Sequence, residues 1–182
     1  MSRGMAGMVL FISSEIMLFG GLFAGYFYVR NQAQEWPGVE HTVGVGLGGA
    51  LTAILITSGV FAHFGVLGIK GGNRSQALLG VGMGIILGSI FIGGQIWEWF
   101  NLMDEGLTAK TGVYGSTFFI LTGFHGAHVI AGICLLLVIF VRAWWGDFTP
   151  RRHLIADAGV LYWHFVDVVW VFLFTVLYVL GS

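Results

Sequence analysis

Five long apolar stretches dominate this sequence and limit what it can fold into. They cover residues 5–29, 44–69, 77–101, 113–141 and 155–180. A helix needs about 20 residues to cross a hydrocarbon core ~30 Å thick, so each stretch is long enough to span a bilayer. Backbone groups in lipid must be satisfied within the chain, which favours helices over strands. The sequence therefore predicts an all-α, polytopic membrane bundle of five transmembrane helices, with residues 1–182 forming a single transmembrane domain.

Composition supports the membrane class and excludes several others. Hydrophobic residues make up 57% of the chain and charged residues only 9%, against about 25% charged residues in soluble domains. The formal net charge of -1 leaves no basic surface to neutralise phosphates, so nucleic acid is excluded as a partner. The single cysteine, Cys134, excludes an intrachain disulfide framework and a CxxC metal site.

The basic residues predict the orientation of the bundle. Cytoplasmic loops of membrane proteins carry an excess of Lys and Arg. Arg30 and Lys110 fall on one side of the predicted bundle, and a larger basic group falls on the other: Arg3, Lys70, Arg74, Arg142, Arg151 and Arg152. This asymmetry predicts a cytoplasmic N-terminus and a C-terminus outside.

The last apolar stretch carries an ionisable pair where the solvent should be lipid. His164 and Asp167 are three residues apart, so on a helix they share one face and can meet, flanked by Trp163 and Trp170. Ionisable groups inside a membrane face protein or water rather than lipid. This pair therefore predicts polar surroundings supplied by the rest of the chain.

Two other stretches carry ionisable residues at similar depth. Glu15 lies about ten residues into the first stretch, roughly 15 Å deep. Two functional roles are open for this carboxylate, a proton relay and a contact with a lipid headgroup. The alternative is a protonated or hydrogen-bonded residue that fixes helix packing. His125 and His128 share one face of the fourth helix. Two histidines can bind a metal, but a metal site needs three or four donors, so bonds to carbonyls or a carboxylate are favoured and no metal site is predicted.

The common depth of these residues predicts that they meet. Leaving any of them unpaired in hydrocarbon is expensive. We therefore expect one buried polar cluster between the first, fourth and last helices, formed by Glu15, His125, His128, His164 and Asp167. Glu98, near the outer end of the third stretch, is expected to be shallow and partly hydrated.

Small residues recur at fourfold spacing and let helix backbones approach closely. These small residues either form a surface that binds a partner or pack the helices of the bundle against one another. They are Gly21/Gly25, Gly44/Gly48 and Gly80/Gly84/Gly88.

Several motifs together resemble the cytochrome c oxidase subunit III family. They are VYGSTFF at residues 113–119, TGFHGAHV at 122–129 and YWHFVDVVW at 162–170, with Ser14-Glu15 before a phenylalanine-bearing apolar run. The resemblance extends in order from about Gly7 to Ser182. It is closest to a five-helix form that lacks the first two helices of the larger, seven-helix form.

The resemblance implies a non-catalytic core subunit III of a proton-pumping haem–copper terminal oxidase in a respiratory chain. Such a subunit packs on the catalytic subunit I, with subunit II and further small subunits nearby, stabilises it and supports proton uptake during oxygen reduction. Haem and copper would lie in those neighbours, so this chain would hold no catalytic centre and no cofactor other than phospholipid. The resemblance places Glu15 and Arg142 at lipid-headgroup contacts. The family's lipid cleft, however, borders the two helices that are missing here.

The same resemblance implies the plasma membrane of a bacterium rather than the mitochondrial inner membrane, and a respiratory supercomplex as a further possible assembly. Two other functions remain open at this point. One is subunit III of a quinol oxidase of the same superfamily. The other is a stand-alone membrane proton channel or transporter, although the sequence offers no inverted repeat and no Gly/Pro-broken helix pair to mark a midplane substrate site.

Overall fold

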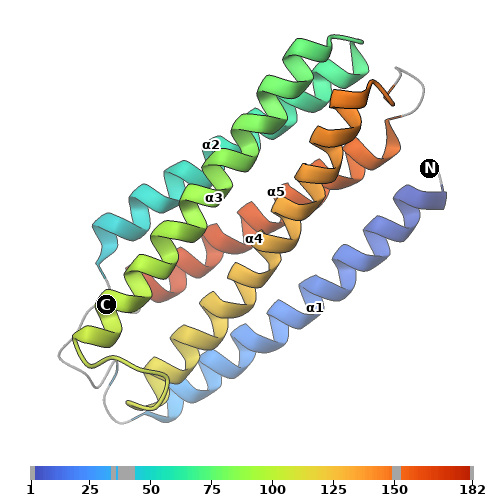
Figure 1. Ribbon diagram of the computed structural model, residues 1–182. Coiled ribbons are helices and arrows are strands. Elements are labelled where there is room, and N and C mark those ends of the chain that lie inside the picture. The colour runs from blue at the N-terminus through green and yellow to red at the C-terminus, as the bar shows by residue number, and fades with distance from the viewer. Residues whose placement is uncertain (1–2, 34–35, 37–43, 149–152, 181–182) are drawn as a thin grey trace.

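The computed structural model describes residues 3–33, 36, 44–148 and 153–180. Within them the chain forms α1 (Arg3–Gln32), α2 (Val45–Lys70), α3 (Arg74–Asp104), α4 (Val113–Trp145) and α5 (Leu154–Phe174), which continues into a short π-helix, η1 (Thr175–Val179). Five helices, the last counted through Val179, are long and apolar enough to cross a membrane. They run alternately up and down, so that α1 begins and η1 ends at opposite ends of the bundle (Figure 1). The prediction of an all-α bundle of five membrane-spanning helices is confirmed.

A tight turn joins α2 to α3. Helix α3 begins at Arg74, earlier than residue 77, where the apolar pattern placed its start. Gly72 adopts a φ of 71°, and the backbone N–H of Asn73 donates to the Gly68 carbonyl at 2.8 Å, which together form a Schellman motif. The Asn73 side chain then accepts from the backbone N–H of Gln76 at 3.1 Å. One polar residue thus ends α2 and caps α3.

The end of α4 also lies beyond the apolar pattern. The helix continues past Arg142 to Trp145, and Gly146 follows with a φ of 78°. The backbone N–H of Asp147 donates to the Arg142 carbonyl at 3.0 Å, which closes another Schellman motif. The predicted end at residue 141 marked the end of the apolar run, whereas the glycine marks the end of the helix.

Close glycine contacts make α2 and α3 the most tightly packed pair. A Cβ added at Gly80 would collide with the backbone of Gly65, and one at Gly84 would lie 3.2 Å from Ala62. This part of the small-residue pattern therefore serves internal packing. A Cβ at Gly21 or Gly25 would meet no atom within 4 Å, so that part of the pattern faces away from the bundle.

Two buried tryptophans fix α5 against its neighbours. The Trp163 ring fills the space at Gly88, where a Cβ would lie 2.7 Å from it. Its indole N–H donates to Ser58 Oγ on α2 at 3.0 Å. The Trp170 indole N–H likewise donates to Thr52 Oγ1 at 2.9 Å. Both rings are fully buried and therefore belong to the α2–α5 contact in the core rather than to the surface beside His164.

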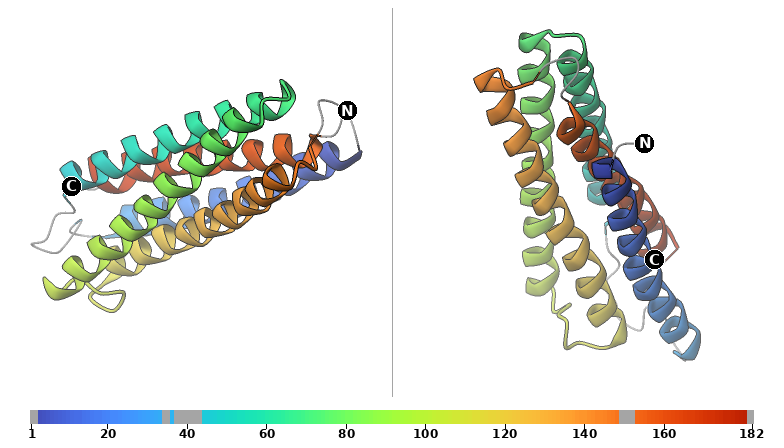
Figure 2. Two further views of the ribbon diagram at one scale, coloured as in Figure 1. Left: turned by 45° about the horizontal axis from the view of Figure 1, so that its top comes forward. Right: turned by 90° about the vertical axis from the view of Figure 1, so that its right-hand side faces the viewer.

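Helix α1 is the least embedded element. It lies along α4 and α5 on the side away from α3 (Figure 2), and only Phe19, Phe23 and Tyr26 are buried. Figure 2 also shows how the remaining helices group together. Many large hydrophobic side chains stay exposed on the outside of the bundle, among them Leu10, Met17 and Val168. Such an apolar exterior suits a lipid or protein environment rather than water.

The alternation of the helices brings the described part of the larger basic group to one end. Arg3 begins α1, Lys70 ends α2, Arg74 begins α3 and Arg142 lies in the last turn of α4. Arg151 and Arg152 lie outside the described residues. The cytoplasmic assignment of this end stays a prediction.

Candidate functional site

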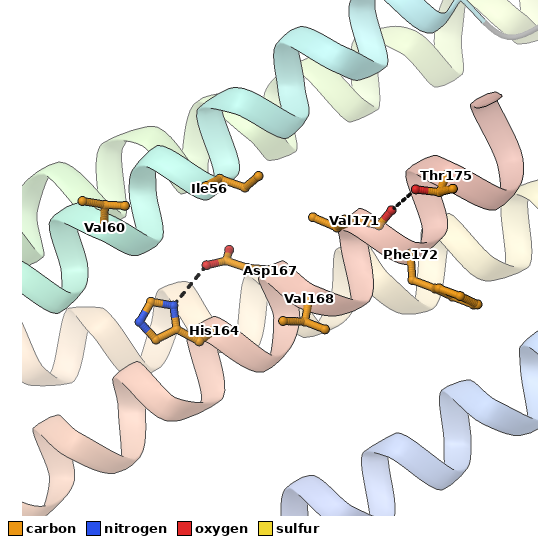
Figure 3. A pocket seen from close by; sticks show the side chains of 8 residues that line it. All are labelled: Ile56, Val60, His164, Asp167, Val168, Val171, Phe172 and Thr175. Atoms are coloured by element: carbon orange, nitrogen blue, oxygen red, sulfur yellow. Dashed lines mark hydrogen bonds and ion pairs between the residues drawn. The ribbon is translucent and has the colours of Figure 1, made fainter.

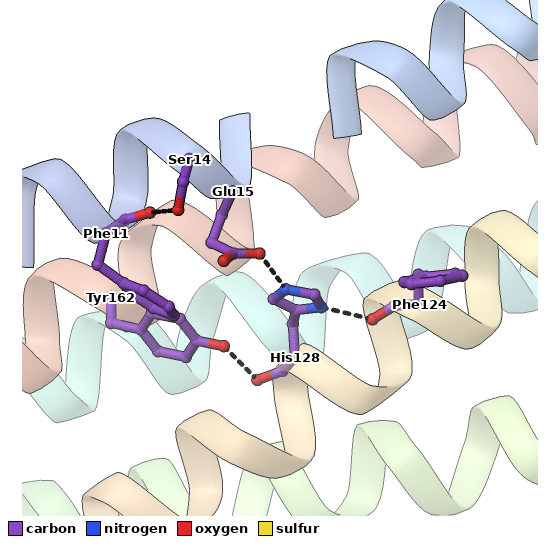
Figure 4. Close-up of polar contacts among 6 residues, drawn as sticks. All are labelled: Phe11, Ser14, Glu15, Phe124, His128 and Tyr162. Atoms are coloured by element: carbon purple, nitrogen blue, oxygen red, sulfur yellow. Dashed lines mark hydrogen bonds and ion pairs between the residues drawn. The ribbon is translucent and has the colours of Figure 1, made fainter. Parts of the chain in front are cut away.

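A carboxylate–imidazole pair joins α1 to α4 near the middle of the bundle. Glu15 Oε2 lies 2.9 Å from His128 Nε2, and the two side chains are only 16% and 14% exposed. The other ring nitrogen, Nδ1, lies 2.7 Å from the carbonyl oxygen of Phe124. The Tyr162 hydroxyl donates to the His128 carbonyl at 3.2 Å, as Figure 4 shows. We call Glu15 and His128 the α1–α4 pair.

The carbonyl beside Nδ1 determines how many protons this pair holds. A carbonyl oxygen only accepts, so Nδ1 of His128 carries a hydrogen. The remaining contact, between Nε2 and Glu15 Oε2, then requires one proton between its two atoms. That proton resides either on the carboxyl group beside a neutral imidazole or on an imidazolium beside a carboxylate. The pair is satisfied in both forms, and the proton can move between them without any change of partner.

His125 lies one turn earlier on α4 but points to a different neighbour. Its Nε2 lies 3.2 Å from the carbonyl oxygen of Val166 on α5, and the side chain is 1% exposed. The rings of Phe91 and Trp170 contact it at centroid distances of 5.8 and 4.9 Å. His125 therefore links α4 to α5 within the aromatic core.

A second set of ionisable groups crosses from α5 to α2. His164 Nδ1 lies 3.5 Å from Asp167 Oδ2, as the i,i+3 spacing predicts, and His164 Nε2 lies 3.5 Å from His63 Nδ1. The carboxylate rests against the backbone of Gly59, where a Cβ would overlap it. The other oxygen, Asp167 Oδ1, is buried and has no hydrogen-bond partner within the described part of the chain. We call His63, His164 and Asp167 the α2–α5 line.

The five residues expected to form one cluster are thus distributed over three places. Glu15 bonds to His128, His164 approaches Asp167, and His125 bonds to a backbone carbonyl. All five lie near the centres of their helices. Depth does not fix the direction around the helix axis. Helix α5 faces α4 on one side and α2 on another, so its own polar residues turn away from the α1–α4 pair.

Glu98 corrects an expectation from the sequence. It is not a shallow, hydrated residue but is 3% exposed. Its Oε2 accepts from the Tyr178 hydroxyl at 2.6 Å and from Gln95 Nε2 at 3.0 Å. The reason is tertiary, since η1 places the Tyr178 ring against Gly48 on α2, from where its hydroxyl reaches Glu98 on α3. The i,i+3 spacing of Gln95 and Glu98 repeats that of His164 and Asp167 and could have revealed this site.

Ion pairs gather at the end of the bundle where the basic residues lie. Lys70 Nζ lies 2.7 Å from Asp157 Oδ1. The Arg142 side chain is 38% exposed, with Nε 3.5 Å from Asp147 Oδ2 and the guanidinium 5.5 Å from the centroid of the Phe148 ring. Arg142 is thus a partly exposed cation held at this end of the bundle.

The two residues expected to contact a lipid headgroup do not lie at one level. His128, the partner of Glu15, precedes Arg142 by 14 residues of α4, which corresponds to about 21 Å along the helix. One headgroup therefore cannot contact both residues, and Glu15 is already bonded to His128.

No group of three or more His, Cys, Asp or Glu side chains in the described ranges is close enough to hold a metal ion. The described histidines instead pair with a carboxylate, a carbonyl or one another.

Comparisons with known proteins agree with the resemblance read from the motifs. A family model described as cytochrome c oxidase subunit III matches residues 1–182. Cytochrome c oxidase subunit 3 of Corynebacterium diphtheriae is 42% identical over 175 residues, covering 94% of this chain and 85% of that protein. The protein of the same name from Thermostichus vulcanus is 36% identical, covering 96% and 86%. The one from Papio hamadryas is 37% identical, covering 97% and 69%.

Proposed function

Because the chain belongs to the cytochrome c oxidase subunit III family and is therefore a membrane subunit of a haem–copper oxidase complex, we propose that it is a non-catalytic subunit of this complex. In this proposal it packs beside the catalytic subunit I, stabilises that subunit and supports its proton uptake. The observation that carries the non-catalytic role is that the described ionisable side chains associate in small, separate groups. Haem and copper, held by the neighbouring subunits, would supply the oxygen chemistry.

The α1–α4 pair supports the part of the proposal that concerns protons. It holds one proton in a bond 2.9 Å long at a depth where hydrocarbon offers no acceptor. Because either partner can carry that proton, the proton can shift between the carboxylate and the imidazole with little rearrangement. Glu15 thus holds a proton within the bundle, and the same bond fixes α1 on α4.

Lipid binding in this proposal rests on Arg142 rather than on a site that also includes Glu15. The Arg142 guanidinium lies at the basic end of the bundle, partly exposed and held beside Asp147 and Phe148. A phospholipid headgroup there would meet a positive charge at the level of the membrane surface. We propose a bacterial plasma membrane as the location, supported by relatives such as those of Corynebacterium and Thermostichus.

Purification of a tagged chain from its native membranes tests this proposal. We expect haem absorbance and a catalytic subunit to co-purify with it. In the complex with Glu15→Gln, we expect the haem content to be unchanged and proton uptake during turnover to be slower. A tagged chain that purifies without any haem protein and conducts protons in liposomes would instead make it a stand-alone channel.

The same preparation identifies the electron donor. A copper-binding cysteine/histidine site in the co-purified second subunit would indicate oxidation of cytochrome c. A second subunit without that site would favour the quinol oxidase alternative.

A further inference from the structure

An apolar groove runs along the outside of the bundle between α2 and α5, beside the α2–α5 line. It has a volume of about 630 Å³ and is lined by Ile56, Val60, His164, Asp167, Val168, Val171, Phe172 and Thr175. Figure 3 shows these side chains along the two helices, with the contact between His164 and Asp167 at one end. From His164 on α5 to Thr175 at the start of η1 the groove follows twelve residues, a rise of about 16 Å.

Among the described residues, this groove is where ionisable side chains at membrane depth are both exposed and incompletely paired. The His164 side chain is 43% exposed, and His63 is exposed as well. Both contacts in the line are 3.5 Å long, and behind them Asp167 Oδ1 is buried without a partner in the described part of the chain. Ionisable residues that face lipid in this way are rare, because hydrocarbon cannot satisfy them. The groove is therefore an unfavourable surface for bulk lipid.

The depth of the line argues against a lipid headgroup as the missing partner. Asp167 lies 13 residues from the start of α5, and α5 with η1 spans 26 residues, so the carboxylate is about 20 Å from that end and close to the middle of the helix. Phospholipid headgroups lie at the membrane surface, and acyl chains offer no hydrogen bond at this depth. A neighbouring transmembrane helix can place a polar side chain there.

The shape of the groove also suits a helix. The residues on α5 recur at spacings of three and four, and those on α2 at a spacing of four, which gives the furrow between two helices into which the ridge of a third can pack. Most of its apolar walls are β-branched residues, whose side chains are stiff. Little ordering is therefore needed before a partner docks.

We propose that the α2–α5 groove is the surface on which a transmembrane helix of a neighbouring oxidase subunit docks, with a hydrogen-bonding side chain directed at His164 and Asp167. This inference rests on the proposed function, because membership of an oxidase complex supplies the partner. The α1–α4 pair needs no such partner, since its two side chains satisfy each other.

Site-specific photo-crosslinking in the assembled complex tests the inference. A benzophenone side chain at Val168, which is 69% exposed in the groove, is compared with one at Ile86, which is 53% exposed on α3 outside it. We expect Val168 to crosslink to a transmembrane subunit of the oxidase and Ile86 to crosslink to lipid. A second groove position, Val60 on α2, provides an independent measurement if the Val168 variant does not assemble.

The outcomes separate the two proposals. Groove positions that crosslink only to lipid, or only to a second copy of this chain, while haem still co-purifies would overturn the docking surface and leave the proposed function intact. Loss of haem co-purification from the unmodified tagged chain would instead overturn the proposed function. We also expect His164→Ala to reduce retention of the chain in detergent-washed complex several-fold, and unchanged retention would count against the docking surface.

Discussion

The α1–α4 pair and the α2–α5 line are built from the same residue types at similar depth, yet they differ in how they are satisfied. Glu15 and His128 are 2.9 Å apart and about one-sixth exposed or less. His164 and Asp167 are 3.5 Å apart, and the histidine is 43% exposed. Depth in the membrane thus does not determine whether an ionisable group is closed off. An ionisable group is closed off when another helix of the same chain covers it, as α1 covers His128.

This difference has an energetic consequence that can be measured. Removing a partner from a closed pair leaves its buried mate unsatisfied within the chain. Removing a residue from an open line changes little until the neighbouring protein is present. Variants of the two regions should therefore separate stability of the isolated chain from retention in the complex.

The largest effect on the isolated chain is expected for Glu15→Ala. The substitution leaves Nε2 of His128 without its partner at 2.9 Å, and interhelical hydrogen bonds in membranes contribute about 1–2 kcal/mol in model peptides. Thermal unfolding of the purified chain in detergent should shift downward. Glu15→Gln, which can still hydrogen-bond to the imidazole, should lose less than half as much, and equal losses would contradict the pairing.

A smaller effect is expected for Gly59→Ala. The added Cβ overlaps Asp167 Oδ2, and overpacking costs about 1–3 kcal/mol, with the low end expected here because a terminal carboxylate can turn aside. Gly93→Ala is the matched control, since a Cβ there meets nothing within 4 Å. Unfolding curves should differ between the two variants, and matching curves would mean that the carboxylate is not held against α2.

Tyr178→Phe tests the buried hydrogen bonds of Glu98. It removes the 2.6 Å bond to Glu98, and the average interhelical hydrogen bond measured in a membrane protein contributes about 0.6 kcal/mol. Tyr28→Phe, at a position that is 68% exposed, is the control and should leave the unfolding temperature unchanged. A loss no larger than that of the control would show that Glu98 does not depend on this donor.

The smallest effect on the isolated chain is expected for His164→Ala. Its contacts are long and its side chain is 43% exposed, and such substitutions usually stay within about 0.5 kcal/mol. Thermal unfolding in detergent should therefore match that of the unmodified chain. A shift as large as that of Glu15→Ala would remove the contrast between the two regions.

Local spacing predicted the contact within a helix but not the contacts between helices. The i,i+3 rule placed His164 beside Asp167 because both lie on α5. The same rule placed His125 and His128 on one face of α4 but could not say that one would reach α5 and the other α1. For Glu98 the depth along the helix suggested hydration, and only the tertiary contact with Tyr178 of η1 revealed a buried hydrogen bond.

By itself the sequence determined the number, order and helical nature of the membrane spans, because backbone groups in hydrocarbon have no other solution. Its motifs also identified the family. The tertiary structure decided the partner of each ionisable residue and which of them are left facing outward. The physical reason is that position along a helix follows from counting residues, whereas the direction of a side chain acquires meaning only once a neighbouring helix lies there.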